Sequence, residues 1–295
     1  MLNAHSLSPA RLLRNVVLVA LFAIVVVAGI FAFTGNSGEF HPPEIIEFFP
    51  KAILFAGTPF ELNRIMLIRL LVVVVVVLLL WLGSRRMKIV PSRGQVVFEF
   101  VLNFVRKSIV IDTLGEKDGK RFMGLLMGIF FTVLGMNLTA TIPGLQIAAS
   151  ANVGLPLVLA VVAYVAFIYA GIKKFGLRYF KNALILPGVP IVLVPFLALL
   201  ELLSTFIVRP VTLILRLLMN MVAGHMLLVL CFSATQFFIV TLLFSQGNAL
   251  GLLGIGSFAF GIAFVALEIF VGALQAYVFA ILTAIYLQMS LAEEH

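Results

Sequence analysis

Hydrophobic residues along the chain gather into six long runs, which are separated by short polar segments. The first four runs extend from Val16 to Phe33, from Ile65 to Leu82, from Phe122 to Ile142 and from Val153 to Ile172. Each has close to the roughly 20 residues that a helix needs to cross a bilayer. The pattern predicts an all-α integral membrane protein with about five to six membrane helices.

The last two runs are too long for ordinary spans. One extends from Ile191 to Phe244 and contains Pro195 and Pro210, and the other extends from Leu250 to Leu287. As a helix, the final run would be about 57 Å long, whereas the hydrocarbon core is only about 30 Å thick. Such runs must tilt steeply, break, or lie partly along the membrane plane. We therefore expect a long, strongly tilted helical hairpin at the C-terminal end.

Basic residues indicate how the chain is oriented in the membrane. They are concentrated between Arg85 and Arg121 and again between Lys173 and Lys181, and both segments should be cytoplasmic by the positive-inside rule. The segment from Asn36 to Arg64 is richer in glutamate and should face outward. Six spans with both ends inside satisfy this distribution, so the C-terminus is predicted to be cytoplasmic.

Two segments each allow two interpretations. The first run is either a retained helix or a cleavable signal peptide, because it is short, N-terminal and preceded by positive charge. No clear small-x-small cleavage site follows Phe33, which favours retention. After Ser92, apolar residues such as Val97, Phe100 and Phe104 recur at helical spacing. They predict an amphipathic helix on the cytoplasmic membrane surface, with a solvated connector helix as the alternative.

Composition agrees with a membrane protein. Apolar residues make up 63% of the chain and charged residues only 11%, compared with roughly 25% charged residues in soluble domains. The net charge of +8 does not indicate nucleic-acid binding, because the basic residues lie in short segments between apolar runs. Cys231 is the only cysteine, so neither a disulfide framework nor a cysteine metal site is expected. We expect no cofactor, and the chain has no glycine-rich nucleotide loop.

Few ionisable side chains remain inside the last two runs, and they carry the functional interpretation. Together with two polar neighbours they are Glu201, Arg209, Arg216, Asn220, His225, Glu268 and Gln275. Arg216 has apolar residues on both sides and no nearby helix end. An arginine at the centre of a membrane helix costs about 2.5–3.5 kcal/mol to insert. A chain that retains it uses it for ion transport or, alternatively, for a salt bridge between helices.

The depths of these residues can be compared by assuming an antiparallel hairpin that turns near residues 245–248. Residues whose numbers add to about 492 then lie at the same depth. Arg216 is level with Gln275, and His225 is level with Glu268. A histidine and a carboxylate at one depth can relay protons. His225 alone would instead be interpreted as a hydrogen-bonded core histidine.

The direction of each side chain follows from a helical rotation of about 100° per residue. Asn220 shares a face with Arg216, whereas His225 lies on the opposite face of that helix. Glu268 and Gln275 form one stripe on the other helix. His225 and Glu268 should lie on the outer side of Arg216, because the first helix of the hairpin enters from the cytoplasm.

Two sequence blocks closely resemble subunit a of the F-type ATP synthase: Arg216–His225 (RLLMNMVAGH) and Leu274–Tyr286 (LQAYVFAILTAIY). Asn137 followed by Pro143 is similar to a further stretch of that family. The resemblance extends from about residue 40 to the end. It implies a proton-channel domain over residues 65–295, preceded by an N-terminal membrane helix and outward loop over residues 1–64. The additional N-terminal helix is not part of the usual family core.

The resemblance also implies a role for each matching residue. Arg216 would be the stator arginine that faces a rotor ring, with Gln275 as its partner and Asn220 as a pore-lining neighbour. His225 and Glu268 would form the outer half-channel.

Three further residues are weaker matches. Glu201 resembles the glutamate of the cytoplasmic side but stands one residue further from the arginine than in some members. Asn137 and Thr212 are additional candidates for the proton path. Many bacterial members have an aspartate shortly after the asparagine, and here the chain reads Asn137-Leu-Thr-Ala140, so no acidic relay is expected there.

The implied function is that of a non-catalytic, proton-translocating stator subunit, whose two half-channels couple proton flow to rotation and to ATP synthesis on other subunits. Its implied partners are a ring of c-type rotor subunits, a b-type peripheral-stalk subunit, the rest of the complex and the lipid bilayer. It would lie in the bacterial plasma membrane as a multi-pass protein. Two alternatives are a secondary ion-coupled transporter, for which we see no internal repeat, and a structural anchor subunit of a respiratory complex.

Overall fold

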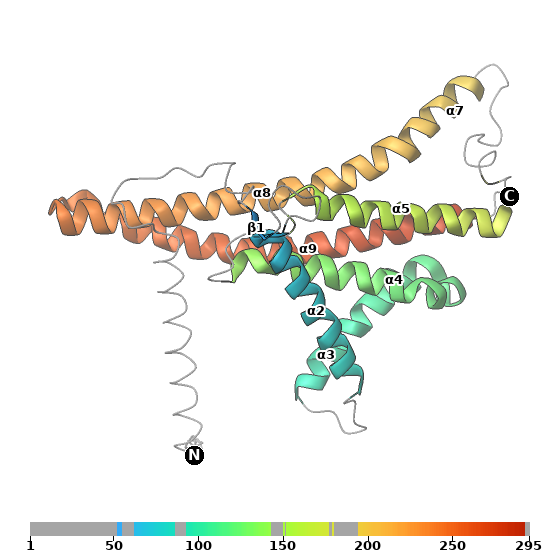
Figure 1. The fold of residues 1–295 in the computed structure, drawn as a ribbon, viewed down its shortest axis with the longest axis horizontal. Helices are drawn as coiled ribbons and strands as arrows, with labels where there is room; N and C mark the ends of the chain where they lie inside the picture. Colours follow the sequence, from blue (N-terminus) through green and yellow to red (C-terminus); the bar gives the residue numbers. More distant parts are fainter. Residues whose placement is uncertain are drawn as a thin grey trace, which may run out of the picture.

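The computed structural model describes residues 52–54, 62–85, 93–142, 150, 152–176, 179 and 194–292 (Figure 1). The predicted first run and most of the predicted outward segment lie outside these residues. The helices are α2 (Arg64–Arg85), α3 (Arg93–Phe104), η2 (Val105–Ile111), α4 (Asp112–Leu138), η3 (Thr139–Thr141), α5 (Gly154–Phe175), α7 (Val194–Leu203), η4 (Ser204–Val208), α8 (Arg209–Gln236), η5 (Phe237–Ser245), η6 (Ala249–Leu252) and α9 (Leu253–Leu291).

The described residues confirm an all-α membrane protein. Five helical segments among them are long and apolar enough to cross a membrane, and they coincide with the second to sixth predicted runs. The exception to the helical architecture is a short antiparallel pair, β1 (Ala52–Leu54) with β2 (Leu62–Asn63), immediately before α2.

The predicted C-terminal hairpin is the longest feature of the molecule. Figure 1 shows α8 and α9 side by side along the long axis, with α5 and α4 beside one end of the pair. In this view α2 descends steeply from the middle of the pair, and α3 crosses the lower part of α2. Helix α9 has 39 residues, which corresponds to about 58 Å. A helix of this length fits a bilayer of about 30 Å only if it is strongly tilted.

The chain passes Pro210 without a break. Pro210 lies in the first turn of α8, and the residues before it, Ser204–Val208, form a π-helical turn that joins α7 to α8. Proline lacks an N–H group, and its ring collides with the carbonyl one turn earlier in a regular helix. The wider π-helical turn relieves both problems, so the run is distorted there and continues.

Contacts across the hairpin confirm the predicted register. Methyl groups placed on Gly224 and Gly261 of the two helices would lie 3.0 Å from Glu268 Oε1 and from a ring carbon of Phe232. In both pairs the residue numbers add to about 492. Glycine at these positions allows the helices to approach closely.

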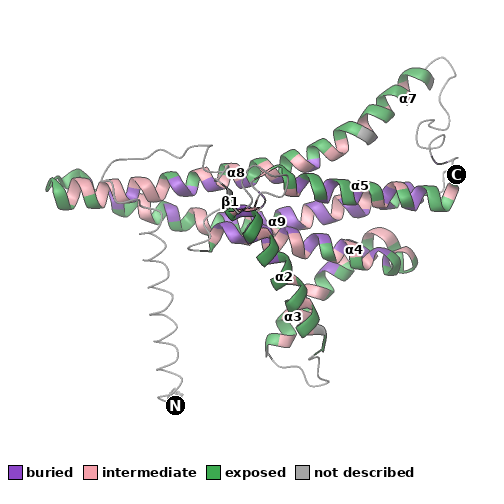
Figure 2. Cartoon of the chain, viewed as in Figure 1, coloured by how far each residue is buried: buried purple, intermediate pink, exposed green. Residues whose placement is uncertain are grey.

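The buried core lies where α9 packs on α4, α5 and α8 (Figure 2). Leu126, Leu217 and Phe279 are almost completely enclosed there. Helix α2 is peripheral, because only Ile65, Ile68 and Val72 on its surface are buried. Most of its other apolar side chains are exposed, as expected for a helix surrounded by lipid.

The helix predicted after Ser92 is present as α3. One of its rings, Phe98, packs against Gly83 at the end of α2, where a side chain at residue 83 would collide with it. Val97 and Phe100 are 64% and 70% exposed. Large apolar side chains that protrude from the protein favour the membrane surface over a solvated connector.

Candidate functional site

Arg216 lies on a face of α8 that points away from the protein. Its side chain is exposed, and so are its neighbours Leu215 and Met219, which are 44% and 58% exposed. Leu213 and Leu217, on the other side of the helix, are buried. Within the described part of the chain, no acidic side chain forms an ion pair with Arg216. The arginine therefore stands on an outward apolar surface without an internal counter-charge.

Asn220 and Gln275 join α8 to α9 one helical turn from Arg216. Nδ2 of Asn220 donates a hydrogen bond of 3.1 Å to Oε1 of Gln275, whose side chain is 4% exposed. The sequence predicted that Arg216 and Gln275 lie at the same depth, and in the structure Gln275 bonds to Asn220, one turn further along α8. Both amides border the face that carries Arg216.

His225 and Glu268 lie in the seam between the same two helices, nearer to the turn of the hairpin. Both are buried, with exposures of 3% and 5%. The carboxylate of Glu268 rests against Gly224, the residue before His225. Neither carboxylate oxygen accepts a hydrogen bond from the residues that the structure describes. Glu268 is thus enclosed beside the residue that precedes His225, and within the described chain its carboxylate keeps free acceptor capacity.

Asn137 of α4 contacts α9 between the two levels just described. Its Nδ2 donates a hydrogen bond of 3.1 Å to the carbonyl of Gly272, and its Oδ1 accepts one of 2.6 Å from Ser150. Gly272 follows Glu268 by four residues and precedes Gln275 by three, so all three share one face of α9. Ser150 and Gly272 were not predicted to belong to this site, because nothing local in the sequence marks them as neighbours of Asn137.

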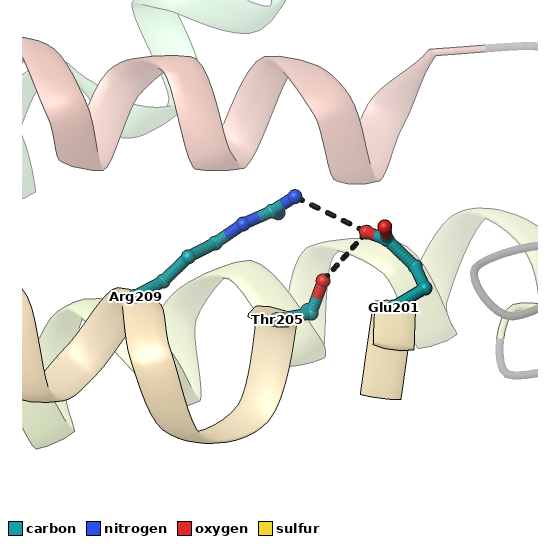
Figure 3. A network of polar contacts seen from close by, with 3 residues as sticks. All are labelled: Glu201, Thr205 and Arg209. Atoms are coloured by element: carbon teal, nitrogen blue, oxygen red, sulfur yellow. Dashed lines mark hydrogen bonds and ion pairs between the residues drawn. The ribbon is translucent and has the colours of Figure 1, made fainter. Parts of the chain in front are cut away.

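Glu201 belongs to a separate cluster at the junction of α7 and α8 (Figure 3). Its Oε1 lies 3.2 Å from Nη2 of Arg209 and accepts a hydrogen bond of 2.9 Å from Thr205. The guanidinium of Arg209 also lies 5.5 Å from the centre of the Tyr286 ring. Both partners of the ion pair are partly exposed, so screening keeps its contribution to stability small.

Among the predicted site residues, Thr212 has the least structural support for a place in the proton path. It is exposed, and its hydroxyl donates a hydrogen bond of 2.9 Å to the carbonyl of Arg209. The side chain therefore satisfies a backbone group of its own helix. No other candidate residue among those described accepts a bond from it.

These groups form an ordered series along the hairpin. The Glu201–Arg209 pair comes first, then Arg216, then Asn220 with Gln275, and finally His225 with Glu268. The series combines one outward charge with polar groups on both sides of it. No cluster suited to a metal ion occurs among the described residues.

Comparisons with known proteins converge on one family. The family model described as ATP synthase A chain matches residues 66–288. A protein of Rhodococcus erythropolis named ATP synthase subunit a is 46% identical over 259 residues, which cover 87% of this chain and 93% of the relative. A protein of the same name from an Arthrobacter species is 38% identical over 263 residues, which cover 88% and 97%. One from Streptomyces lividans is 36% identical and covers 79% and 81%.

Proposed function

The chain belongs to the ATP synthase subunit a family, the proton-channel stator subunits of F-type ATP synthases, and on this premise we propose how its residues carry protons. It is a multi-pass membrane protein and a non-catalytic subunit of the complex. Because the chain belongs to this family, the transporter and anchor-subunit alternatives are ruled out. The proton-channel domain comprises residues 65–295, which contain the whole family match over residues 66–288.

Arg216 acts on a carboxylate that arrives from outside the chain. The observation that carries this proposal is its exposed position among apolar side chains, with no counter-charge from the described residues. A rotor carboxylate at about 4 Å would gain roughly 4 kcal/mol from the arginine at an effective dielectric of about 20. That energy favours release of the rotor proton and still leaves the ion pair breakable. The same positive charge keeps the two half-channels from joining into one proton wire.

The two sides of Arg216 are the two half-channels. His225 and Glu268 receive protons on the outer side, since they lie toward the hairpin turn. Glu201 serves the cytoplasmic side, near the junction of α7 and α8. Asn220 and Gln275 border the arginine between them. The transported ion is the proton.

The C-terminus lies in the cytoplasm. Nζ of Lys174 donates a hydrogen bond of 2.8 Å to the carbonyl of Leu291, so the basic end of α5 meets the end of α9. Lys173 and Lys174 belong on the cytoplasmic side by the positive-inside rule. The ring of c-type subunits docks on the Arg216 face, a b-type stalk subunit contacts the chain elsewhere, and the complex resides in the bacterial plasma membrane.

The test is ATP-driven proton pumping in inverted membrane vesicles that carry Arg216→Ala or Arg216→Lys. Blotting establishes that the complex is assembled, and Arg106→Ala, an exposed arginine of η2, is the matched control. We expect both Arg216 variants to lose pumping, because a lysine has a shorter reach and a different donor geometry. Normal pumping by assembled Arg216→Ala would contradict the assigned role.

A further inference from the structure

The α4–α5 connection contains a polar tether that reaches α9 at the centre of the proton path. Ser150 and Asn137 are 0% and 2% exposed, and they are joined by a hydrogen bond of 2.6 Å. Asn137 continues to the carbonyl of Gly272 at 3.1 Å. A carbonyl oxygen can only accept, so the amide nitrogen of Asn137 must face Gly272. Its oxygen then faces Ser150, whose hydroxyl must donate.

The tether contacts α9 at a position where rotation of the helix would redirect the side chains of the proposed proton path. Gly272 lies between Glu268 and Gln275 on one face, so its position sets the direction of both side chains. A methyl group on Gly272 would lie 3.2 Å from Cβ of Asn137, which shows how closely α4 approaches there. Asn137 has no ionisable group and both of its described bonds are to neutral partners, so it is suited to holding a helix.

The outer end of the tether is held by α2. Nη2 of Arg69 donates a hydrogen bond of 3.3 Å to the carbonyl of Asn152, two residues after Ser150. The side chain of Asn152 in turn accepts a hydrogen bond of 3.1 Å from the backbone of Gly154, where α5 begins. An arginine inside a hydrophobic run thus supports the segment that carries Ser150.

We propose that Ser150 is a positioning residue for proton translocation, which orients Asn137 so that α9 presents Glu268 and Gln275 to α8. The inference rests on the proposed function, because it assigns Ser150 a purpose only if those two residues serve the proton path. Ser150 acts through Asn137 and touches no proton carrier.

The test uses the complete ATP synthase in inverted vesicles. Ser150→Ala should lower the rate of proton pumping per assembled complex by about fivefold, the factor expected for one lost buried hydrogen bond. Ser290→Ala is the control, because Ser290 is also buried on α9's side of the core and its hydroxyl bonds only to Leu287 of its own helix. Asn137→Ala combined with Ser150→Ala should be no worse than Asn137→Ala alone, since one tether is removed in each case.

A merely structural role would lower the amount of assembled complex and leave the pumping rate per assembled complex unchanged, which would overturn the proposal. If Ser150→Ala fails to assemble, the contact between α4 and α9 is tested with the substitutions Asn137→Cys and Gly272→Cys in a Cys231→Ala background. The two cysteines are then oxidised, and formation of a disulfide is measured. The 3.2 Å separation is close to that of disulfide Cβ atoms, so a cross-link is expected. Its absence would overturn the tether. Normal pumping by Arg216→Ala would instead overturn the proposed function.

Discussion

The outward face of α8 and the seam between α8 and α9 hold two ionisable residues in opposite surroundings. Arg216 stands exposed among Leu215 and Met219, whereas Glu268 is enclosed against Gly224. Figure 2 shows the same contrast along α8, where exposed and buried positions alternate around the helix. The arginine has no acidic partner among the described residues. The glutamate can exchange a proton only with groups that reach into the seam.

Under the proposed function, this contrast separates two tasks of the subunit. An exposed charge can meet each carboxylate of a moving partner in turn, because nothing within the described chain competes for it. An enclosed carboxylate with free oxygens can hold a proton without being neutralised by a fixed partner. Exchanging the surroundings of the two residues would disable both tasks.

The largest effect within the seam is expected from Glu268→Gln. The amide has the same shape but cannot carry a proton, so ATP-driven pumping should fall by about 10²-fold or more, the scale of a lost proton-transfer group. Assembly should be normal, because Glu268 makes no hydrogen bond to the described residues that would be lost. Pumping rates per assembled complex provide the measurement, and a rate near that of the native chain would show that Glu268 only fills space.

A smaller effect is expected from Asn220→Ala. The change removes the hydrogen bond to Gln275 and leaves a buried amide oxygen unsatisfied, which costs about 1–3 kcal/mol. Pumping should fall by about tenfold, because Gln275 no longer holds its place beside Arg216. Thr212→Val is the control, as the Thr212 hydroxyl bonds only to a backbone carbonyl of its own helix. Equal rates for the two variants would contradict a role for the Asn220–Gln275 pair.

The smallest effect is expected from Gly224→Ala. The new methyl group would lie 3.0 Å from Oε1 of Glu268 and must displace that carboxyl by a few tenths of an ångström. Pumping should fall by about two- to fivefold, a cost near 1 kcal/mol for mild overpacking. Gly256→Ala on α9 is the matched control, because nothing lies within 4 Å of its added methyl group. Equal pumping rates for Gly224→Ala and Gly256→Ala would show that Glu268 does not lie against Gly224.

The sequence was sufficient for the spans and for the hairpin register because both depend on repeating local properties. The lengths of the hydrophobic runs predicted α2, α4, α5 and α9. Counting residues on the two sides of the hairpin turn placed His225 level with Glu268, and in the structure Glu268 lies against the adjacent Gly224. The hydrogen-bond partner of Gln275 could not be read from the count, because its amide bonds to Asn220, one turn from the residue at its own depth.

Contacts between distant segments could not be predicted. Ser150 is an ordinary polar residue of a connection, and its bond to Asn137 exists only because α4, α5 and α9 pack together. The Glu201–Arg209 pair is similar, because the π-helical turn between its members sets their relative rotation. Such contacts depend on tertiary geometry that no periodic pattern encodes.

The most direct test of the contrast between face and seam is photo-crosslinking from single cysteines in assembled membranes. Cysteines replace Met219 on the outward face, Leu217 in the core and Val161 on the exposed side of α5, with Cys231→Ala as the background. Each is labelled with a maleimide-benzophenone, and adducts are identified by mass spectrometry. We expect an adduct with a small rotor subunit from residue 219 only. Rotor adducts from residue 161 but not from residue 219 would contradict the claim that the Arg216 face meets the rotor.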